Sequence, residues 1–195
     1  MLDRPARRRL DPLLDRIAAR CIARGLSANA VTLIGFGVGL LALLFIAGRH
    51  DLIGLLLLLL NRTADGIDGA IARRTQATER GGYLDIVFDF IIYSGVPFAF
   101  AVSRPEQALA AAFLVFSFVG TGTSFLAFAI FKRDAPAMGK AFHYLGGLTE
   151  GTETIALFVI VLLFPDAFTP AAWIFGTLCW LTTVGRISVA MSALR

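Results

Sequence analysis

Four aspartates lie close together in this sequence, and their types and spacing suit metal-dependent chemistry. Asp65 and Asp68 are three residues apart, whereas Asp85 and Asp89 are four apart. On helices, both spacings place the members of a pair on one face. With no His or Cys nearby, carboxylate oxygens favour hard cations such as Mg²⁺ or Mn²⁺. Four carboxylates can hold two divalent ions, the arrangement that stabilises attacking and leaving oxygens in phosphoryl transfer.

The sequence around the aspartates is that of a membrane protein. The chain has 195 residues, of which 57% are hydrophobic and 16% are charged, and its mean hydropathy is +0.75. This composition excludes an ordinary soluble domain. Ionisable groups within membrane segments are costly, so an acidic cluster flanked by apolar sequence is interpreted as a functional site with a compensating cation.

The apolar segments predict an all-α integral membrane protein with six transmembrane helices. Spanning the hydrocarbon layer takes about 20 apolar residues per helix. We expect spans at about residues 29–48, 52–72, 81–102, 108–131, a fifth that follows the polar stretch 132–140 and ends at 165, and a sixth at 170–193. The expected domains are a juxtamembrane helix within residues 1–26 and a transmembrane catalytic domain over residues 27–195.

An amphipathic helix is expected ahead of the first span. Apolar residues recur at helical spacing over residues 10–24. Asp11 can cap this helix with Pro12 at its first position, and Gly25 can end it. We interpret it as a helix that lies in the membrane interface. The alternative is a soluble helix that packs on a partner.

The distribution of basic residues predicts the orientation. If the N-terminus is cytoplasmic, fourteen of the 18 Lys and Arg residues fall in cytoplasmic segments, and only Arg49 and Arg104 fall in outer turns. This asymmetry follows the positive-inside rule and fits an even number of spans, with both termini in the cytoplasm. Basic residues near the N-terminus favour an anionic lipid surface over nucleic acid. The fourteen are Arg4, Arg7, Arg8, Arg9, Arg16, Arg20, Arg24, Arg73, Arg74, Arg80, Lys132, Arg133, Lys140 and Arg195.

The two pairs of aspartates are expected to converge. The short turn between Arg73 and Gly81 predicts antiparallel neighbouring helices. Since a helix rises 1.5 Å per residue, Asp65 is expected about 10 Å inside the cytoplasmic end of its helix, in a polar cavity open to the cytosol. Arg73 either meets a phosphate there or only follows the positive-inside rule. Four glycines beside the acids would let helices or a nucleotide approach the backbone: Gly66, Gly69, Gly81 and Gly82.

The acidic segment resembles a known family signature. It contains Asp65-x-x-Asp68-Gly69-x-x-Ala72-Arg73, a short spacer, and Gly81-x-x-x-Asp85-x-x-x-Asp89. This pattern resembles the signature of the CDP-alcohol phosphotransferases, also called CDP-alcohol phosphatidyltransferases. The chain looks most like a small subgroup from the bacterial inner membrane. The resemblance implies transfer of a phosphate-linked alcohol from a CDP-alcohol to an acceptor hydroxyl, with release of CMP.

The resemblance also implies roles for individual residues. The four aspartates would bind two divalent ions that hold the diphosphate, and Asp89 would also take the proton of the acceptor hydroxyl. A spacer of seven residues replaces the commoner eight, so either the turn is one residue shorter or Gly82 serves in place of Gly81. In the element that opens the first span, Ala28 replaces the usual proline. The residues implied to border the nucleotide are Asn29, Thr32, Gly69, Ala72, Arg73, Gly81 and Gly82.

The acceptor site is expected where the fifth span begins. Residues 143–154 contain no Lys or Arg, whereas family members that take phosphorylated acceptors usually have basic residues near there. We therefore expect a neutral or cationic acceptor alcohol near Glu150 and Glu153, unless these residues only form a solvated helix end. Arg186, within the sixth span, is expected to pair with a carboxylate of the acidic site or a phosphate, or else to snorkel.

The sequence therefore predicts a multi-pass enzyme of phospholipid biosynthesis in the bacterial inner membrane, with two Mg²⁺ or Mn²⁺ ions per site. No Ser-His-Asp or Cys-His arrangement indicates a covalent nucleophile, so direct attack by the acceptor hydroxyl is expected. The resemblance implies CDP-diacylglycerol as donor and a homodimer. Two alternatives stay open: a cation- or proton-coupled transporter that uses the same aspartates, and an inactive membrane scaffold.

Overall fold

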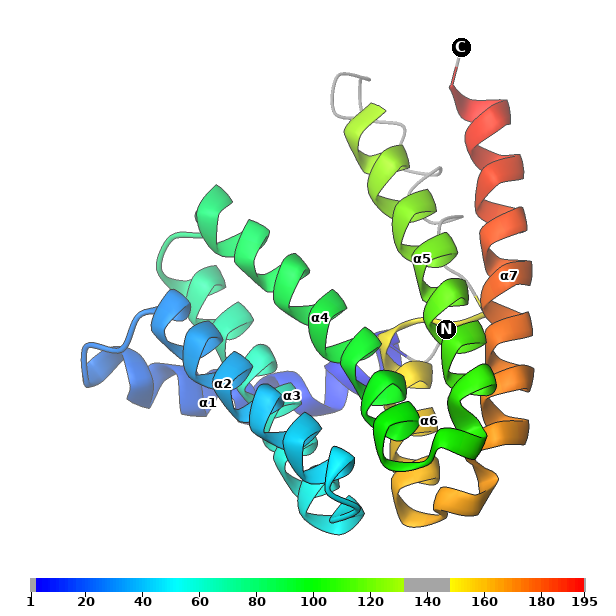
Figure 1. The fold of residues 1–195 in the computed structure, drawn as a ribbon. Helices are drawn as coiled ribbons and strands as arrows, with labels where there is room; N and C mark the ends of the chain where they lie inside the picture. The colour runs from blue at the N-terminus through cyan, green and yellow to red at the C-terminus, as the bar shows by residue number, and fades with distance from the viewer. Residues whose placement is uncertain (1–2, 132–147, 195) are drawn as a thin grey trace.

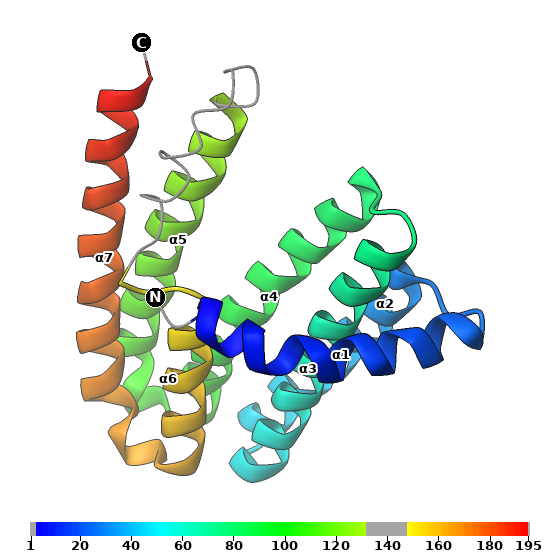
Figure 2. The same ribbon diagram turned by 180° about the vertical axis from the view of Figure 1, so that it is seen from behind.

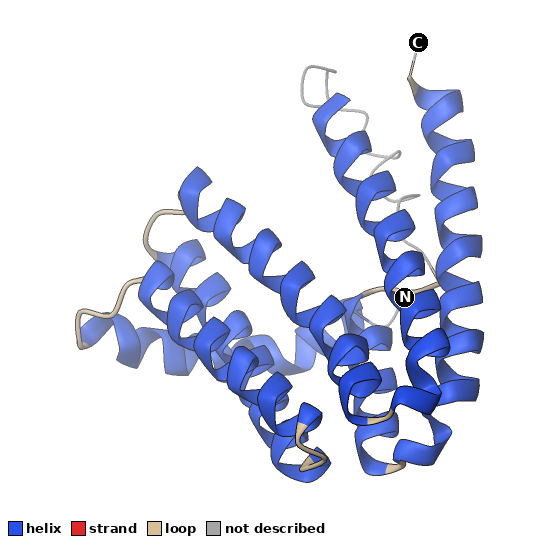
Figure 3. Cartoon of the chain, viewed as in Figure 1, coloured by secondary structure: helices blue, strands red, loops and turns tan. Residues whose placement is uncertain are grey.

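The structure is a computed structural model that describes residues 3–131 and 148–194. Within these residues every regular element is a helix (Figure 3), as predicted. Short 3-10 turns at Pro105–Gln107 and Pro165–Ala167 precede the fifth and the last helix. The α-helices are α1 (Asp3–Ala23), α2 (Ala28–Ala47), α3 (Asp51–Arg74), α4 (Glu79–Ser103), α5 (Ala108–Phe131), α6 (Gly151–Leu163) and α7 (Phe168–Ala193).

Four helical segments are long and apolar enough to cross a membrane: Ala28–Ala47, Glu79–Ser103, Pro105–Phe131 and Pro165–Ala193. Helix α3 has 24 residues, but its charged side chains keep it out of this group. Helix α6 has 13 residues, which at 1.5 Å per residue is shorter than the roughly 30 Å hydrocarbon layer. The polar stretch 132–140 lies outside the described residues. The prediction of an integral membrane fold is supported, and the count of six spans stays a prediction.

The helices form two groups that α4 connects. Helix α2 packs against both α3 and α4, α4 packs against α5, and α5 packs against α7. Figure 1 shows α2 and α3 on one side of α4, with α5, α6 and α7 on the other. Gly39 permits the contact between α2 and α4, because a Cβ there would lie 2.7 Å from Ile92 Cδ1. Small residues of this kind let transmembrane helices approach closely.

Helix α1 lies across the other helices instead of alongside them (Figures 1 and 2). It begins at Asp3, so the prediction that Asp11 caps it was wrong. The arginines before Asp11 are good helix formers, and Pro12 is exposed, so water can reach the carbonyl that its missing N–H leaves unbonded. Gly25 follows the helix with a φ of 75°, as a terminating glycine does. Ala18 is fully buried and packs in a cluster with Ala70 and Ile71 of α3.

Polar contacts join the α2–α3 turn to the end of α4, at the end of α3 away from the acidic segment. Arg104 forms an ion pair with Asp51, and their side chains are only 11% and 13% exposed. The Arg104 guanidinium also lies 5.1 Å from the centroid of the Phe100 ring. Arg49 Nε donates a hydrogen bond to the Ser103 carbonyl at 2.8 Å. The two arginines expected in outer turns are therefore both paired, and they tie the α2–α3 turn to the end of α4.

Candidate active site

A pocket lies between α2, α3 and α4. Helices α3 and α4 pack mainly on α2 and make few direct contacts with each other. This arrangement leaves room for side chains between the two helices. The pocket contains about 220 Å³ of empty space, part of it open to the outside. Its lining residues are Thr32, Gly35, Phe36, Asn61, Arg62, Asp65, Asp68, Asp85, Phe88 and Asp89.

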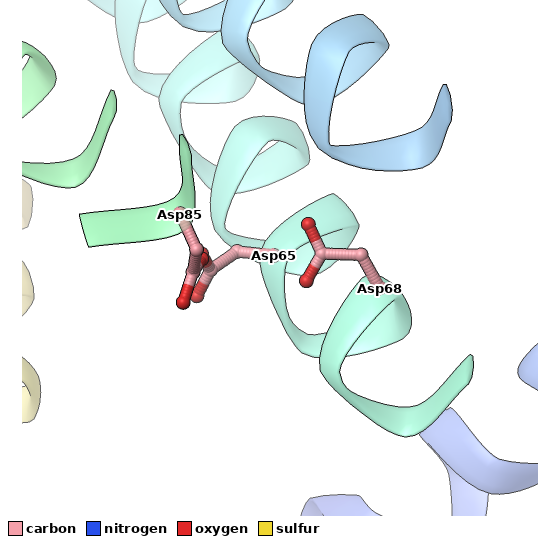
Figure 4. Close-up of side chains that lie close together, drawn as sticks. All are labelled: Asp65, Asp68 and Asp85. Atoms are coloured by element: carbon pink, nitrogen blue, oxygen red, sulfur yellow. The ribbon is translucent and has the colours of Figure 1, made fainter. Parts of the chain in front are cut away.

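Three of the four aspartates converge in this pocket. Asp65 and Asp68 come from α3 and Asp85 from α4 (Figure 4). One carboxylate oxygen from each lies within 4.8 Å of the others. Asp68 is buried, and the other two are half-buried. The spacing of the acids in the sequence therefore brings carboxylates from two helices to one point, as predicted.

Asp89 has a different neighbour. Arg62 Nη1 lies 2.7 Å from Asp89 Oδ1 and 4.0 Å from Asp65 Oδ2. The Arg62 guanidinium also donates to the Tyr93 hydroxyl at 3.2 Å and, through Nε, to Asn61 Oδ1 at 2.8 Å. Arg62 lies within the expected span 52–72, and no role was predicted for it. Its position three residues before Asp65, on the same helix face, was the signal that could have found it.

Thr32 contacts one of the acids. Its Oγ1 lies 2.5 Å from Asp68 Oδ2 and 3.0 Å from the Ala28 carbonyl oxygen, so one hydroxyl proton serves both acceptors. The resemblance suggested that Thr32 borders a nucleotide. In the structure Thr32 lines the pocket, and its hydroxyl contacts a carboxylate of the acidic group. Phe36 and Phe88 stack with ring centroids 3.9 Å apart and form an apolar wall beside it.

Asn29 lies at the beginning of α2 and faces the beginning of α4. A Cβ on Gly81 would lie 2.8 Å from Asn29 Oδ1 and 3.0 Å from the Thr78 hydroxyl that caps α4. At Gly82, by contrast, a Cβ would meet nothing within 4 Å. Gly81 is therefore the glycine whose missing side chain permits a close approach. Asn29, Gly81 and Gly82 lie outside the residues that line the pocket.

The remaining motif residues on α3 lie beyond the pocket lining. A Cβ on Gly69 would contact Arg73 Nη1 at 3.5 Å. Arg73 is about half exposed and lies 3.9 Å from Asp11 of α1, and Ala72 next to it is partly buried. Gly66 was expected to let a helix or a nucleotide approach. A Cβ there would lie 2.9 Å from Leu14 Cδ1, so α1 occupies this space.

The three acceptor-site candidates do not line the pocket. Glu150 caps α6, and the Glu153 side chain accepts a hydrogen bond from the Glu150 N–H at 3.2 Å. Arg186 of α7 donates to the Thr121 carbonyl at 2.9 Å and lies over the Phe125 ring. These contacts stabilise a helix end and the packing of α7 on α5. The expected roles of the three in acceptor binding stay predictions.

The acidic group fits a hard divalent cation. Carboxylate oxygens around one Mg²⁺ lie at about 2.1 Å from the ion, so two of them are at most roughly 4.2 Å apart. The oxygens of Asp65, Asp68 and Asp85 are already within 4.8 Å of one another, and a small rotation of the side chains would close the difference. Like charges this close and this buried need a cation to offset them. The donor set is all oxygen, which suits Mg²⁺ or Mn²⁺.

Comparisons with known proteins identify the family and the fold. A family model described as CDP-alcohol phosphatidyltransferase matches residues 25–185. The inner membrane protein YnjF of Escherichia coli is 51% identical over 193 residues, which cover 96% of this chain and 94% of that protein. Archaetidylinositol phosphate synthase of Pyrococcus horikoshii is 25% identical over 182 residues, which cover 93% and 92%. The fold is similar to a crystal structure of Mycobacterium tuberculosis phosphatidylinositol phosphate synthase (PgsA1) with CDP-DAG bound, with a TM-score of 0.66, 21% identity and coverage of 92% and 94%.

Proposed function

The chain belongs to the CDP-alcohol phosphatidyltransferase family, and on that premise we propose that it transfers the phosphatidyl group of CDP-diacylglycerol to the hydroxyl of an acceptor alcohol. The observation that carries the proposal is the convergence of the Asp65, Asp68 and Asp85 oxygens in a pocket that Asp89 also lines. The donor is supported by the CDP-DAG bound in the M. tuberculosis structure of similar fold. None of the relatives named above supports the transporter alternative.

The proposed reaction is a single displacement at phosphorus. The acceptor hydroxyl oxygen attacks the phosphorus that carries the diacylglycerol, and the bond from that phosphorus to the bridging oxygen breaks. CMP leaves with the bridging oxygen, and Asp89 takes the hydroxyl proton. Two divalent ions held by Asp65, Asp68, Asp85 and Asp89 would supply the positive charge that the diphosphate requires. A divalent ion held there would also acidify a nearby hydroxyl, so the Asp89 carboxylate would be a sufficient base.

The nucleotide is proposed to lie beyond the open side of the acidic group. Asn29 at the beginning of α2 lies close to Gly81 at the beginning of α4, and Arg73 lies near the end of α3, beside Gly69. Gly69 and Ala72 border the same region, together with Gly82. Thr32 contributes indirectly in this proposal, because its hydroxyl holds Asp68.

The enzyme is proposed to act at the cytoplasmic face of a bacterial inner membrane, with six spans, both termini in the cytoplasm and two chains per assembly. The YnjF homologue is named an inner membrane protein, and the charge distribution supports the orientation. The acceptor is proposed to be a neutral or cationic alcohol. Glu150 and Glu153 at the beginning of α6 would leave little favourable charge for a sugar phosphate.

Release of CMP tests the proposed function directly. Purified protein in detergent is incubated with Mg²⁺ or Mn²⁺, CDP-diacylglycerol and a panel of alcohols, and the lipid products are identified by mass spectrometry. We expect metal-dependent release of CMP, matched by one new phospholipid, and neither product from the Asp65→Asn variant. A wild-type protein that yields no CMP with any alcohol, yet carries cations into liposomes in a manner abolished by Asp65→Asn, would support the transporter instead.

A further inference from the structure

Arg62 is a cation built into the acidic pocket, and the proposed reaction assigns it no role. Its side chain is only 9% exposed. A buried arginine is costly unless ion pairs and hydrogen bonds satisfy its guanidinium. Here Asp89, Tyr93 and Asn61 all contact it at 2.7–3.2 Å. The side chain is therefore held in one position by its surroundings.

The partners of Arg62 are themselves fixed. Asn61 is buried, and its Nδ2 donates to the Gly35 carbonyl of α2 at 2.9 Å. The Tyr93 ring lies under the guanidinium, with the Arg62 Cζ 5.0 Å from the ring centroid. A planar guanidinium can hold a carboxylate and two further partners at once, which a lysine ammonium does less specifically. The network thus connects α2, α3 and α4 through the side chains of Arg62 and Asn61.

This arrangement divides the four aspartates unequally. Asp65, Asp68 and Asp85 bring oxygens within 4.8 Å of one another, whereas Asp89 is engaged by Arg62 at 2.7 Å. Asp65 belongs to this group of three, and its Oδ2 also lies 4.0 Å from Arg62 Nη1, the nitrogen that contacts Asp89. The sequence pattern alone treats the acids as two equivalent pairs. The structure instead shows a group of three and a fourth aspartate, Asp89, which makes the closer of the two ion pairs with Arg62.

We infer that Arg62 is a positioning residue that holds the Asp89 carboxylate in place. A first divalent ion then binds Asp65, Asp68 and Asp85, and the Asp89 carboxylate is oriented to accept the proton of the acceptor hydroxyl. A second ion near Asp89 then binds more weakly, because it competes with Arg62 for the carboxylate and is repelled by the positive charge. This inference rests on the proposed function for the role of Asp89. Its effect on metal binding can be measured without any substrate.

Metal titration gives the first test. Full-length protein in detergent is stripped of metal and titrated with Mn²⁺, and free Mn²⁺ is followed by electron paramagnetic resonance. In wild type we expect one tighter and one weaker ion per chain. Arg62→Gln removes one positive charge a few ångströms from the site, so we expect the weaker ion to bind at least about tenfold more tightly. Arg74→Gln, on the same helix with its partner Asp15 at 4.0 Å, is the matched control and should leave both affinities unchanged.

A double-mutant cycle shows whether the effect passes through Asp89. When Arg62→Gln is made in an Asp89→Asn background, we expect a smaller gain in Mn²⁺ affinity, because the carboxylate released by the first change is absent and only the loss of charge repulsion remains. An equal gain in both backgrounds would overturn the inference. So would an Arg62→Gln protein whose two Mn²⁺ affinities equal those of wild type.

Kinetics separate positioning from direct substrate binding. Arg62→Gln is expected to lower kcat by at least about 30-fold while the KM for the donor changes by less than about threefold. A raised KM with unchanged kcat would show that Arg62 binds the diphosphate, and would overturn the positioning role. If wild type itself releases no CMP, the proposed function fails, but the Mn²⁺ titrations still decide the role of Arg62.

The Arg62→Lys variant is a control for the possibility that Arg62→Gln loses activity only because it does not fold. Lysine keeps the charge but not the fork of donors, so the second Mn²⁺ should bind as weakly as in wild type and kcat should fall between those of wild type and Arg62→Gln. Size-exclusion chromatography confirms that each variant is folded. A lysine variant that binds the second Mn²⁺ as tightly as Arg62→Gln would contradict the argument from charge.

Discussion

Replacement of Thr32 by valine tests how the acidic group is assembled. Valine has nearly the shape of threonine but cannot donate the hydrogen bond from Thr32 Oγ1 to Asp68 Oδ2, which is 2.5 Å long. A hydrogen bond to a charged group contributes about 1.5–3 kcal/mol. The same hydroxyl also faces the Ala28 carbonyl at 3.0 Å, so only part of this energy orients Asp68. We therefore expect an effect just below that range, about 1.4 kcal/mol, which is a tenfold loss of affinity for the tighter divalent ion.

The assay is the Mn²⁺ titration of metal-free protein, together with the rate of CMP release as a function of Mg²⁺ concentration. In Thr32→Val the Mg²⁺ concentration for half-maximal rate should rise about tenfold, with the maximal rate less affected. Thr32→Ser keeps the hydroxyl and should behave as wild type. Thr63→Val is the matched control, because the exposed Thr63 hydroxyl bonds only the Leu59 carbonyl of its own helix, at 2.8 Å.

Two results would refute this reasoning. If Thr32→Val binds Mn²⁺ as wild type does, the hydroxyl does not orient Asp68 for the metal. If Thr32→Val leaves metal binding intact but raises the KM for the CDP-alcohol, Thr32 contacts the nucleotide, as the family resemblance alone suggested.

Three further predictions concern the base, the outer ion pair and α1. Asp89→Asn should eliminate CMP release, and full activity in this variant would remove Asp89 from the mechanism. Asp51→Ala should lower the free energy of unfolding by about 3 kcal/mol, because it leaves the nearly buried Arg104 without its carboxylate partner. The measurement is the midpoint of thermal unfolding in detergent, and an unchanged midpoint would contradict this prediction. Gly66→Val should displace α1, since even a Cβ would lie 2.9 Å from Leu14 Cδ1, and limited proteolysis should then remove the N-terminus faster than in wild type.

The course of most helices could be predicted from the sequence. Helices α2, α3, α4 and α7 begin and end within about two residues of the expected bounds, and α5 coincides with them. Apolar composition, turn residues and charge breaks are local properties, so they can be interpreted without tertiary structure. Helix α1 is the exception, because strong helix formers carried it through Pro12 to Asp3.

The identity of the acidic site could be predicted as well. The spacing of the aspartates places each pair on one helix face, and the surrounding motif resembles a single family, to which the chain belongs. The short turn between α3 and α4 also indicated that carboxylates from these two helices would meet, as those of Asp65, Asp68 and Asp85 do. These inferences need only the periodicity of a helix and the chemistry of carboxylates.

The partners of these acids were decided by the tertiary structure. Three contacts depend on the distance and rotation between different helices. They are the contact of Arg62 with Asp89, that of Thr32 with Asp68, and that of Leu14 with the space beside Gly66. Those quantities are set by side-chain packing along the whole length of α1, α2, α3 and α4, and no local sequence pattern contains them. The sequence by itself thus determined which residues could do chemistry, and the packing of the helices determined which of them face one another.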